Sequence, residues 1–542
     1  MSVDVPVSLD GPGPATPPRT VRHTVPRPAF ESLLTGGGDV DAVTRLTAAE
    51  SSRRLLLMRV LLDAVERESP TEGPLPPFTT AWDALVGAGQ DPATRLLALP
   101  HTGMWAAHVL RRLRGTRPDP APLWVDLGHL HNLAAAALVL AGRGFRQPVV
   151  VREQWVVLPG LGAARLAAGR SWDVAEVEAC DGVTHIRYGQ DRVAVGEGRS
   201  TDNGPAWYPL RHLHAESEHE PITLALEDLV PYRGMRGPTP PEPLTAAQAR
   251  RWQVMLGQAW DVLVAQDRPA ARAMARGLAT IVPMAATEPY RPESASSGDG
   301  FGSAVASAPD DAVQLASTLV HEFQHIKLSA VLHLWTLHAA EQTKCFYAPW
   351  RDDPRPVGGM LQGVYAFHGV AAFWRARRHV AHGAEADLAH FEFALWRTQL
   401  HHGLGALRAS PYLTDHGRRL VGELRAQVEP WLTEVVPSQV ADAATQAIAD
   451  HRAAWRIRHL SPDAATVDAL ARAWSARSFR ADDHAAPTPR EQDAPTLVGD
   501  PTAWRLDARA VLYRRRLAQP EGFARLCALD AYGAAEPAEA PA

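Results

Sequence analysis

The spacing of hydrophobic residues divides the chain into segments of different character. Apolar side chains recur every three or four residues over most of its length, which is the pattern of helices buried on one face. Between Gln147 and Tyr232 the pattern changes to short runs rich in valine and other strand-forming residues, separated by glycine, aspartate and proline. We therefore expect a mainly α fold with a smaller α+β region.

This pattern also predicts where the segments begin and end. The proline-rich stretch Pro238–Pro243 marks one boundary, and Thr245 is placed to cap the helix that follows it. A chain of 542 residues exceeds the size at which a single core stops growing, so several domains are expected. The expected segments are a disordered leader (1–28), a helical N-terminal region (29–146), a small β-rich region (147–237), a helical catalytic domain with a metal site (238–451), C-terminal helices (452–532) and a disordered tail (533–542).

The strongest chemical signal is a His-Glu-x-x-His motif. His321 and His325 are four residues apart, so on a helix both imidazoles lie on one face, one turn apart, and can bind one metal ion. Glu322 would lie beside that ion, where it can hold a metal-bound water or a proton. Chance matches occur in a chain with 23 histidines, but they should fall on solvated faces. The neighbours here are apolar and predict a buried, zincin-like metal helix packed in the helical catalytic domain: Leu315, Leu319, Val320, Phe323, Ile326 and Leu328.

The third metal ligand must come from elsewhere in the chain. His333 lies about 12 Å further along the same helix, which is too far to reach the ion. The next apolar helix, Met360–Trp374, has one strongly ligating side chain, His368, and we predict it as the third ligand. A core histidine bonded to a backbone carbonyl is the alternative, and Glu341 is the fallback ligand if the metal helix ends early.

The composition of the chain indicates which partners and which cellular compartment to expect. A net charge of −5 argues against nucleic acid or an anionic membrane as the main partner, because both require a basic face. The three cysteines, Cys180, Cys345 and Cys527, are far apart and form no CxxC pair, which suits a reducing compartment. The longest apolar run, Leu133–Gly142, has about half the length of a membrane helix. We expect a cytoplasmic protein.

Four stretches carry a resemblance to a known family. Phe301-Gly302, Leu319–His325, Tyr347–Pro356 and Leu361–Tyr365 are similar to the HEXXH-motif proteins encoded beside peptide-modifying radical enzymes, described as 2-oxoglutarate-dependent H-E-x-x-H-type peptide β-hydroxylases. The resemblance implies Fe(II), 2-oxoglutarate and O₂ as cofactors and cosubstrates. It also implies a precursor peptide as the substrate, hydroxylated at a side-chain β-carbon during ribosomal peptide modification.

The resemblance leads to two further expectations. The far carboxylate of 2-oxoglutarate favours a bidentate arginine, and the loop between the two ligand helices offers Arg351 and Arg355. A salt bridge within the loop, to Asp352 or Asp353, is an equally good explanation of each arginine. The stretch Phe301–Ser307 alternates small and apolar residues, and we expect an edge strand there onto which a substrate peptide can add.

Two other functions fit the same motif. In a zinc metallopeptidase, Glu322 would be the general base that activates zinc-bound water. The sequence counts against it, because it shows no secretion signal and no carboxylate on the second helix. A non-catalytic, metal-stabilised protein that presents a peptide to another enzyme is the second alternative.

Overall fold

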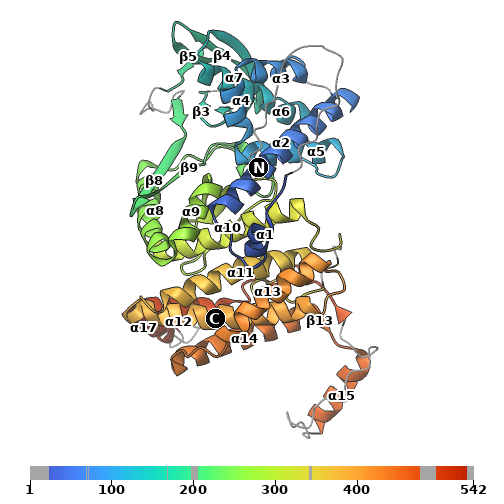
Figure 1. Cartoon of the computed structure of the whole chain (residues 1–542), viewed down its shortest axis with the longest axis vertical. Helices are drawn as coiled ribbons and strands as arrows, with labels where there is room; N and C mark the ends of the chain where they lie inside the picture. Colours follow the sequence, from blue (N-terminus) through green and yellow to red (C-terminus); the bar gives the residue numbers. More distant parts are fainter. Residues whose placement is uncertain are drawn as a thin grey trace, which may run out of the picture.

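The chain is a mixed α/β protein with 55% helix and 16% strand. The computed structural model describes residues 23–68, 70, 73–167, 169–196, 206–340, 343, 345–476 and 496–533. The prediction of a mainly α fold, with a zincin-like helix in a helical catalytic domain, is therefore wrong. Two sheets account for the difference, and three strands of the second sheet lie inside the segment expected to be helical (Figure 1).

Seven helices form the N-terminal part of the chain. They are α1 (Arg27–Leu34), α2 (Val40–Glu68), α3 (Phe78–Gly87), α4 (Gln90–Leu97), α5 (Pro100–Leu113), α6 (Leu123–Leu127) and α7 (His129–Ala141). The stretch Leu123–Ala141 is long and apolar enough to cross a membrane by length and composition alone, and 72% of the tested window is buried inside the protein. In the structure α7 contacts α3 and the first sheet, so these residues belong to a core.

The first sheet has seven antiparallel strands in the order β6-β5-β4-β1-β2-β3-β7. Its edge strands β6 and β7 touch, which leaves a nearly closed barrel. Val149, Val151 and Val177 are buried and pack with helix α7, as the alternation of apolar residues in these strands requires. The strands are β1 (Phe145–Arg152), β2 (Trp155–Leu158), β3 (Gly162–Arg165), β4 (Trp172–Cys180), β5 (Val183–Tyr188), β6 (Asp191–Ala194) and β7 (Ala206–Pro209).

The second sheet has five strands in the order β11-β12-β10-β9-β8. Strands β9, β10 and β12 are parallel, whereas β8 and β11 run antiparallel to their neighbours. The expected edge strand at Phe301–Ser307 is present as β12, but β12 lies between β10 and β11, so the edge is β11. The bounds are β8 (Arg211–Ser217), β9 (Glu220–Leu226), β10 (Thr280–Met284), β11 (Ser294–Ala295) and β12 (Ser303–Ser307).

Between β9 and β10 the chain forms η1 (Pro231–Arg233), α8 (Ala246–Gln266) and α9 (Arg268–Gly277). The predicted cap at Thr245 is confirmed, because its side chain accepts the Gln248 amide N–H while the Gln248 side chain binds the Thr245 amide. Helix α8 contacts both β8 and α10, and its buried face closes one side of the second sheet.

From Ala312 onward the described residues form helices and one short pair of strands, β13 (Leu460–Ser461) and β14 (Thr496–Leu497). Helix α10 carries the motif and lies between the second sheet and α11 (Figure 1). Its N-terminus is capped by Asp311, whose carboxylate accepts the Gln314 amide N–H. The helices are α10 (Ala312–Leu334), α11 (Val357–Arg377), α12 (Gly383–Arg408), α13 (Asp415–Trp431), α14 (Ser438–His459), α15 (Ala464–Ser475), α16 (Ala508–Ala518) and α17 (Pro520–Gly533).

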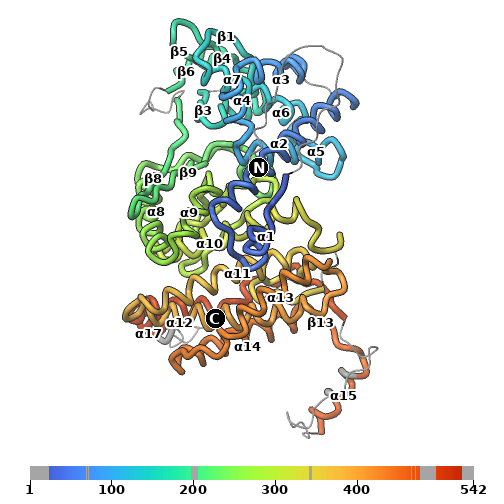
Figure 2. Tube along the Cα trace, viewed as in Figure 1, coloured from blue at the N-terminus to red at the C-terminus, as the bar shows by residue number. Residues whose placement is uncertain are grey.

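The N-terminal helices share a core with the motif helix. Leu33 of α1 and Leu46 of α2 are buried in the same cluster as Leu319 of α10. The turn after α1 is held by the ammonium group of Lys327, which donates to the carbonyl oxygens of Gly36 (3.0 Å) and Gly37 (2.6 Å). In Figure 2, α1 accordingly reaches the middle of the molecule, beside α10 and α11.

Candidate metal centre

The two motif histidines converge on one point. His321 and His325 lie on one face of α10, and their Nε2 atoms are 3.0 Å apart. Two nitrogens that each bind one ion at about 2.0–2.1 Å are separated by about 3 Å when the angle at the ion is near 90°. The observed separation suits two ligands of one metal ion, and it is also that of a hydrogen bond between the two imidazoles. Burial lowers the pKa of His321 well below its ordinary range, which favours the neutral imidazole that a metal requires.

A glutamine fixes the orientation of one imidazole. The Nδ1 of His325 lies 2.9 Å from the Oε1 of Gln362 on α11, and the Nε2 of Gln362 donates to the hydroxyl of Ser329 at 3.1 Å. An amide oxygen only accepts hydrogen bonds, so Nδ1 carries the proton and the lone pair of Nε2 is free. Outer hydrogen bonds of this kind hold a metal-ligating histidine in its tautomer and orientation.

Glu322 lies beside the pair and is fully buried. Its Oε1 is 3.9 Å from the Nε2 of His321, and neither carboxylate oxygen makes a regular hydrogen bond within the described part of the chain. Burial raises the pKa of Glu322, an effect that His325 and the hydroxyls of Ser294 and Ser296 partly offset. Burying a carboxylate that the neighbouring hydroxyls reach only weakly is costly, so this arrangement favours a bound group such as a metal-coordinated water.

An aromatic wall covers one side of the pair. The ring of Phe367 on α11 meets His321 edge-on at 4.8 Å and is stacked between Trp350 (4.9 Å) and Trp396 (4.2 Å). Trp350 fits only because Gly363 has no side chain, since a Cβ there would lie 2.3 Å from the indole. The wall removes water from this side of the site, which strengthens the electrostatic interactions within it.

The structure does not bring His368 to the motif histidines. Its ring stacks on Trp431 of α13 at 5.3 Å and lies against Gly36 in the turn after α1. Phe367 faces the pair instead, and the next residue on a helix points about 100° away. Burial lowers the pKa of His368 to about 4, as expected of a neutral core histidine. The alternative ligand Glu341 lies outside the described residues.

Arg351 and Arg355 lie together in the loop before α11. The Nε of Arg351 and the Nη1 of Arg355 bind the two oxygens of Asp353 at 3.1 and 3.0 Å. Burial raises the pKa of Asp353, but the two arginines outweigh it and the pKa is lowered. The structure thus contains the loop salt bridge, and two guanidinium groups share one carboxylate, which leaves a surplus positive charge. Asp352 is engaged elsewhere, by the backbone N–H groups of Arg505 and Leu506.

A second group of side chains, in the N-terminal part of the chain, lies close enough together to hold a metal ion. Among the described residues, only His108, Asp119 and Asp126 bring three ligand-type side chains within 4.8 Å of one another. Asp126 is also bonded to the guanidinium groups of Arg112 and Arg152. Two arginines already balance the two carboxylates, so a divalent cation would meet no net negative charge. We interpret this cluster as an ion-pair network within the N-terminal part.

Sequence reasoning missed four residues of the site. Gln362 lies in the stretch Leu361–Tyr365, which carries the family resemblance, and this was the available signal in the sequence. In the structure it lies on α11 opposite His325. Phe367 was passed over for its neighbour His368. Ser294 in β11 and Ser296 just after it gave no signal, because a two-residue strand in a serine-rich segment has no alternating pattern.

No protein-family model matches the chain, and no curated protein matches it significantly.

Proposed function

We propose that the chain is an Fe(II)- and 2-oxoglutarate-dependent enzyme that hydroxylates a side-chain β-carbon in a ribosomally synthesised precursor peptide. The observation that carries the proposal is the 3.0 Å separation of the Nε2 atoms of His321 and His325, with the ring of His325 oriented by Gln362. The proposed enzyme works in the cytoplasm with O₂ and without a nucleic-acid or membrane partner.

The described residues bring together two imidazoles, those of His321 and His325, and a third protein ligand is usual both for a catalytic zinc ion and for the iron of a hydroxylase. A 2-oxo acid chelates a metal through its carboxylate and keto oxygens and would fill two further positions. Bound iron and cosubstrate would supply the oxidising chemistry with O₂.

The chain's own residues have separate tasks in this proposal. His321 and His325 hold the ion, and Gln362 keeps the second ring in place. The wall around Phe367 excludes water from one side. Glu322 holds a water or a proton beside the ion. One of Arg351 and Arg355 would exchange its contact with Asp353 for the far carboxylate of 2-oxoglutarate, since the three side chains together retain one positive charge.

The edge strand β11 supports a peptide as the substrate. Its Ser294 lies beside Glu322, and β11 pairs with β12 on one side only. An extended peptide can add to such an edge through main-chain hydrogen bonds, which require no particular sequence. This would place a side chain of the peptide next to the two imidazoles.

A zinc metallopeptidase is the second candidate, and the position of Glu322 favours it. A carboxylate 3.9 Å from a ligand nitrogen is where a general base for metal-bound water would stand. In a peptidase, Glu322→Gln removes nearly all turnover, because no other group takes the proton from water. In the hydroxylase, no water is deprotonated, and Glu322→Gln retains measurable turnover.

The direct test of the proposal is an anaerobic calorimetric titration of 2-oxoglutarate into the Fe(II)-loaded protein. We expect saturable binding to the wild type and weaker binding to Arg351→Gln or Arg355→Gln. Arg408→Gln, an exposed arginine at the end of α12, is the control and should bind as the wild type does. Absence of binding to the wild type would overturn the hydroxylase. Metal binding with neither cosubstrate binding nor peptide cleavage would indicate a non-catalytic, peptide-presenting partner.

A further inference from the structure

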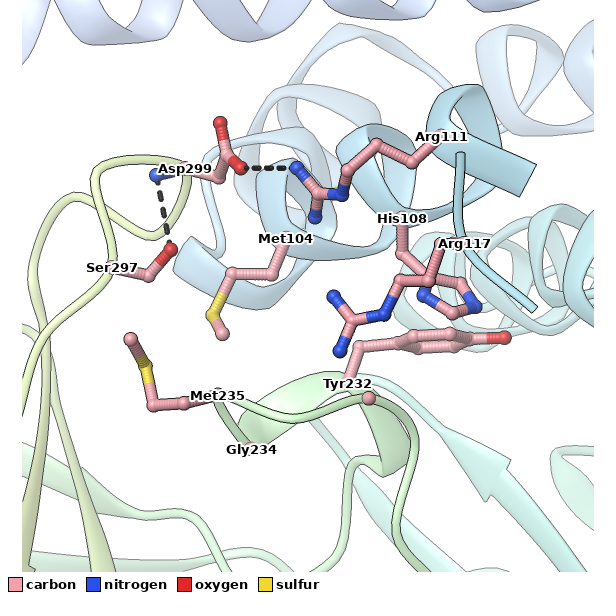
Figure 3. Close-up of a pocket in the computed structure, with 10 residues that line it drawn as sticks. Met104, His108, Arg111, Arg117, Tyr232, Gly234, Met235, Ser297 and Asp299 are labelled. Carbon is pink, nitrogen blue, oxygen red and sulfur yellow. Dashed lines mark hydrogen bonds and ion pairs between the residues drawn. The ribbon is translucent and has the colours of Figure 1, made fainter. Parts of the chain in front are cut away.

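A small pocket, shown in Figure 3, is lined by residues to which the proposed function assigns no role. It is formed where α5, the segment after η1 and the loop between β11 and β12 meet, and we call it the Arg117 pocket. Its volume is about 40 Å³. Roughly 10–15 Å³ is enough for one water, so the pocket has room for about three heavy atoms. The residues used below are Met104, Arg111, Arg117, Met235, Ser297 and Asp299.

The charge of the pocket is positive. Asp299 is matched by two arginines, with Arg111 Nη1 at 3.0 Å and Arg53 Nη2 at 2.8 Å. Arg117 has no ion pair or hydrogen bond among the described residues, and its guanidinium group points into the pocket in Figure 3. An unpaired guanidinium group in a cavity of this size favours a carboxylate, which it can bind through two parallel hydrogen bonds.

The sides of the pocket suit an acidic side chain in particular. Met104 and Met235 line the pocket on the side towards which the guanidinium group of Arg117 points (Figure 3). Their thioether groups can contact the methylene groups of aspartate or glutamate while the arginine binds the carboxylate. Met235 is 44% exposed, so the pocket opens to solvent on that side and a peptide can reach it.

The loop that lines the pocket continues directly from β11. Ser294 and Ser296 lie beside Glu322, Gly298 lies against Ser329 of α10, and Asp299 reaches the pocket. From Ala295 to Asp299 the chain can span at most about 13 Å, because a strand rises about 3.3 Å per residue. An extended peptide of about four residues would cover the same distance.

The free edge of β11 has the right orientation for such a peptide. The Ser307 amide donates to the carbonyl oxygen of Glu293 at 2.8 Å, and Ala295 is paired with Val305. In an antiparallel ladder alternate residues face the partner strand, so the main-chain groups of Ser294 face away from β12. A peptide bound there would run between the metal centre and the Arg117 pocket.

We propose that the Arg117 pocket binds an acidic side chain of the substrate peptide, about four residues from the residue that is modified. The proposal rests on the proposed function in so far as it takes the substrate to be a peptide. It adds a specificity determinant that is separate from the metal and its ligands.

The experiment is a selection of random 12-residue peptides displayed on phage against the full-length protein loaded with Zn²⁺, which binds imidazole without turnover of 2-oxoglutarate. It compares the wild type, Arg117→Gln and Arg114→Gln. Arg114 is the matched control, an exposed arginine at the C-cap of α5, three residues before Arg117. We expect aspartate or glutamate to be enriched at one position with the wild type and with Arg114→Gln, and the enrichment to vanish with Arg117→Gln.

A selected peptide is then measured by fluorescence polarisation. Its affinity should fall about tenfold or more on Arg117→Gln, and similarly when its acidic residue is replaced by the neutral amide, because a charge-assisted hydrogen bond is lost. Selection without acidic enrichment, or an enrichment unchanged by Arg117→Gln, would overturn the proposal. If the protein selects acidic peptides but does not bind 2-oxoglutarate, the hydroxylase proposal is wrong and the pocket proposal stands. If it binds 2-oxoglutarate but does not select acidic peptides, the pocket proposal is wrong and the hydroxylase proposal stands.

Discussion

The Nδ1 of His325 on α10 lies 2.9 Å from the Oε1 of Gln362 on α11. This contact joins the two helices at the metal face and leaves the Nε2 of His325 with a free lone pair. It also separates the site from an accidental pair of histidines on a helix surface, because a second helix supplies the group that orients the ring.

Replacing Gln362 tests this relationship. Gln362→Leu keeps the volume of the side chain but removes the acceptor, so the ring of His325 can rotate and change its tautomer. We expect affinity for Zn²⁺ or Co²⁺ to fall about 10- to 100-fold with unchanged helicity. Gln258→Leu, on an exposed face of α8, is the control. Competition with a chromogenic chelator measures the metal affinity of both variants. Equal affinity in the two would contradict the role assigned to Gln362.

The histidines of α10 and α11 should behave differently on substitution. His321→Ala and His325→Ala should each abolish stoichiometric metal while preserving helicity, because α10 is held by its buried apolar face. His368→Ala should retain the metal but lower the free energy of unfolding by about 2 kcal/mol or more, since it leaves a cavity beside Trp431. Metal analysis and urea unfolding of the three variants distinguish the two metal ligands from the core histidine. Loss of metal in His368→Ala would restore it as the third ligand.

The aromatic wall depends on a glycine. In Gly363→Ala the added Cβ would lie 2.3 Å from the rigid Trp350 indole, so we expect a loss of about 1–3 kcal/mol of stability and displacement of Phe367 from His321. Gly405→Ala in α12 meets no atom within 4 Å and should stabilise the protein by up to about 1 kcal/mol through helix propensity. Thermal unfolding of the two variants should shift in opposite directions, and a Gly363→Ala protein as stable as the wild type would refute the packing argument.

The N-terminal part should show acid sensitivity that comes from His129. Burial lowers its pKa to about 3 in the folded protein, whereas an unfolded histidine titrates near 6.5. The unfolded state therefore binds the proton first, so this contribution to stability is present above about pH 6.5 and is lost as the pH falls towards 3. Between pH 6.5 and 5 the loss should approach about 2 kcal/mol.

His129→Phe removes the titrating group and keeps an aromatic ring beside Trp105 and Tyr232. Urea unfolding at pH 7, 6 and 5 should show a shallower loss of stability in this variant than in the wild type. Parallel curves for the two proteins would show that His129 does not contribute.

Local patterns predicted the local parts of the site. The spacing of His321 and His325, the buried face of α10 and the cap at Thr245 each depend on residues within a few positions of one another, and these predictions agree with the geometry. The salt bridge of Arg351 and Arg355 with Asp353 is equally local and was weighed from the sequence as an alternative to cosubstrate binding.

The parts of the fold that depend on contacts between distant residues could not be predicted from local sequence patterns. Strand β10 is five residues long and contains Pro283, and β11 has two residues, so neither shows an alternating pattern. Pairing with β9 and β12 makes β10 a strand, and pairing with β12 makes β11 one. Phe367 faces the motif histidines and His368 faces Trp431, because one residue of helical register separates them, and that register is set by packing against α10 and α13.

Incorporation of oxygen from ¹⁸O₂ into succinate tests the central claim most directly. Fe(II)-loaded protein incubated with 2-oxoglutarate under ¹⁸O₂ should release succinate that carries one labelled oxygen atom, and it should do so even without a peptide. His321→Ala should form none above the level of free iron. Unlabelled 2-oxoglutarate recovered intact from the wild type, together with peptide cleavage that takes its oxygen from water in the zinc-loaded protein, would contradict the hydroxylase and establish the peptidase.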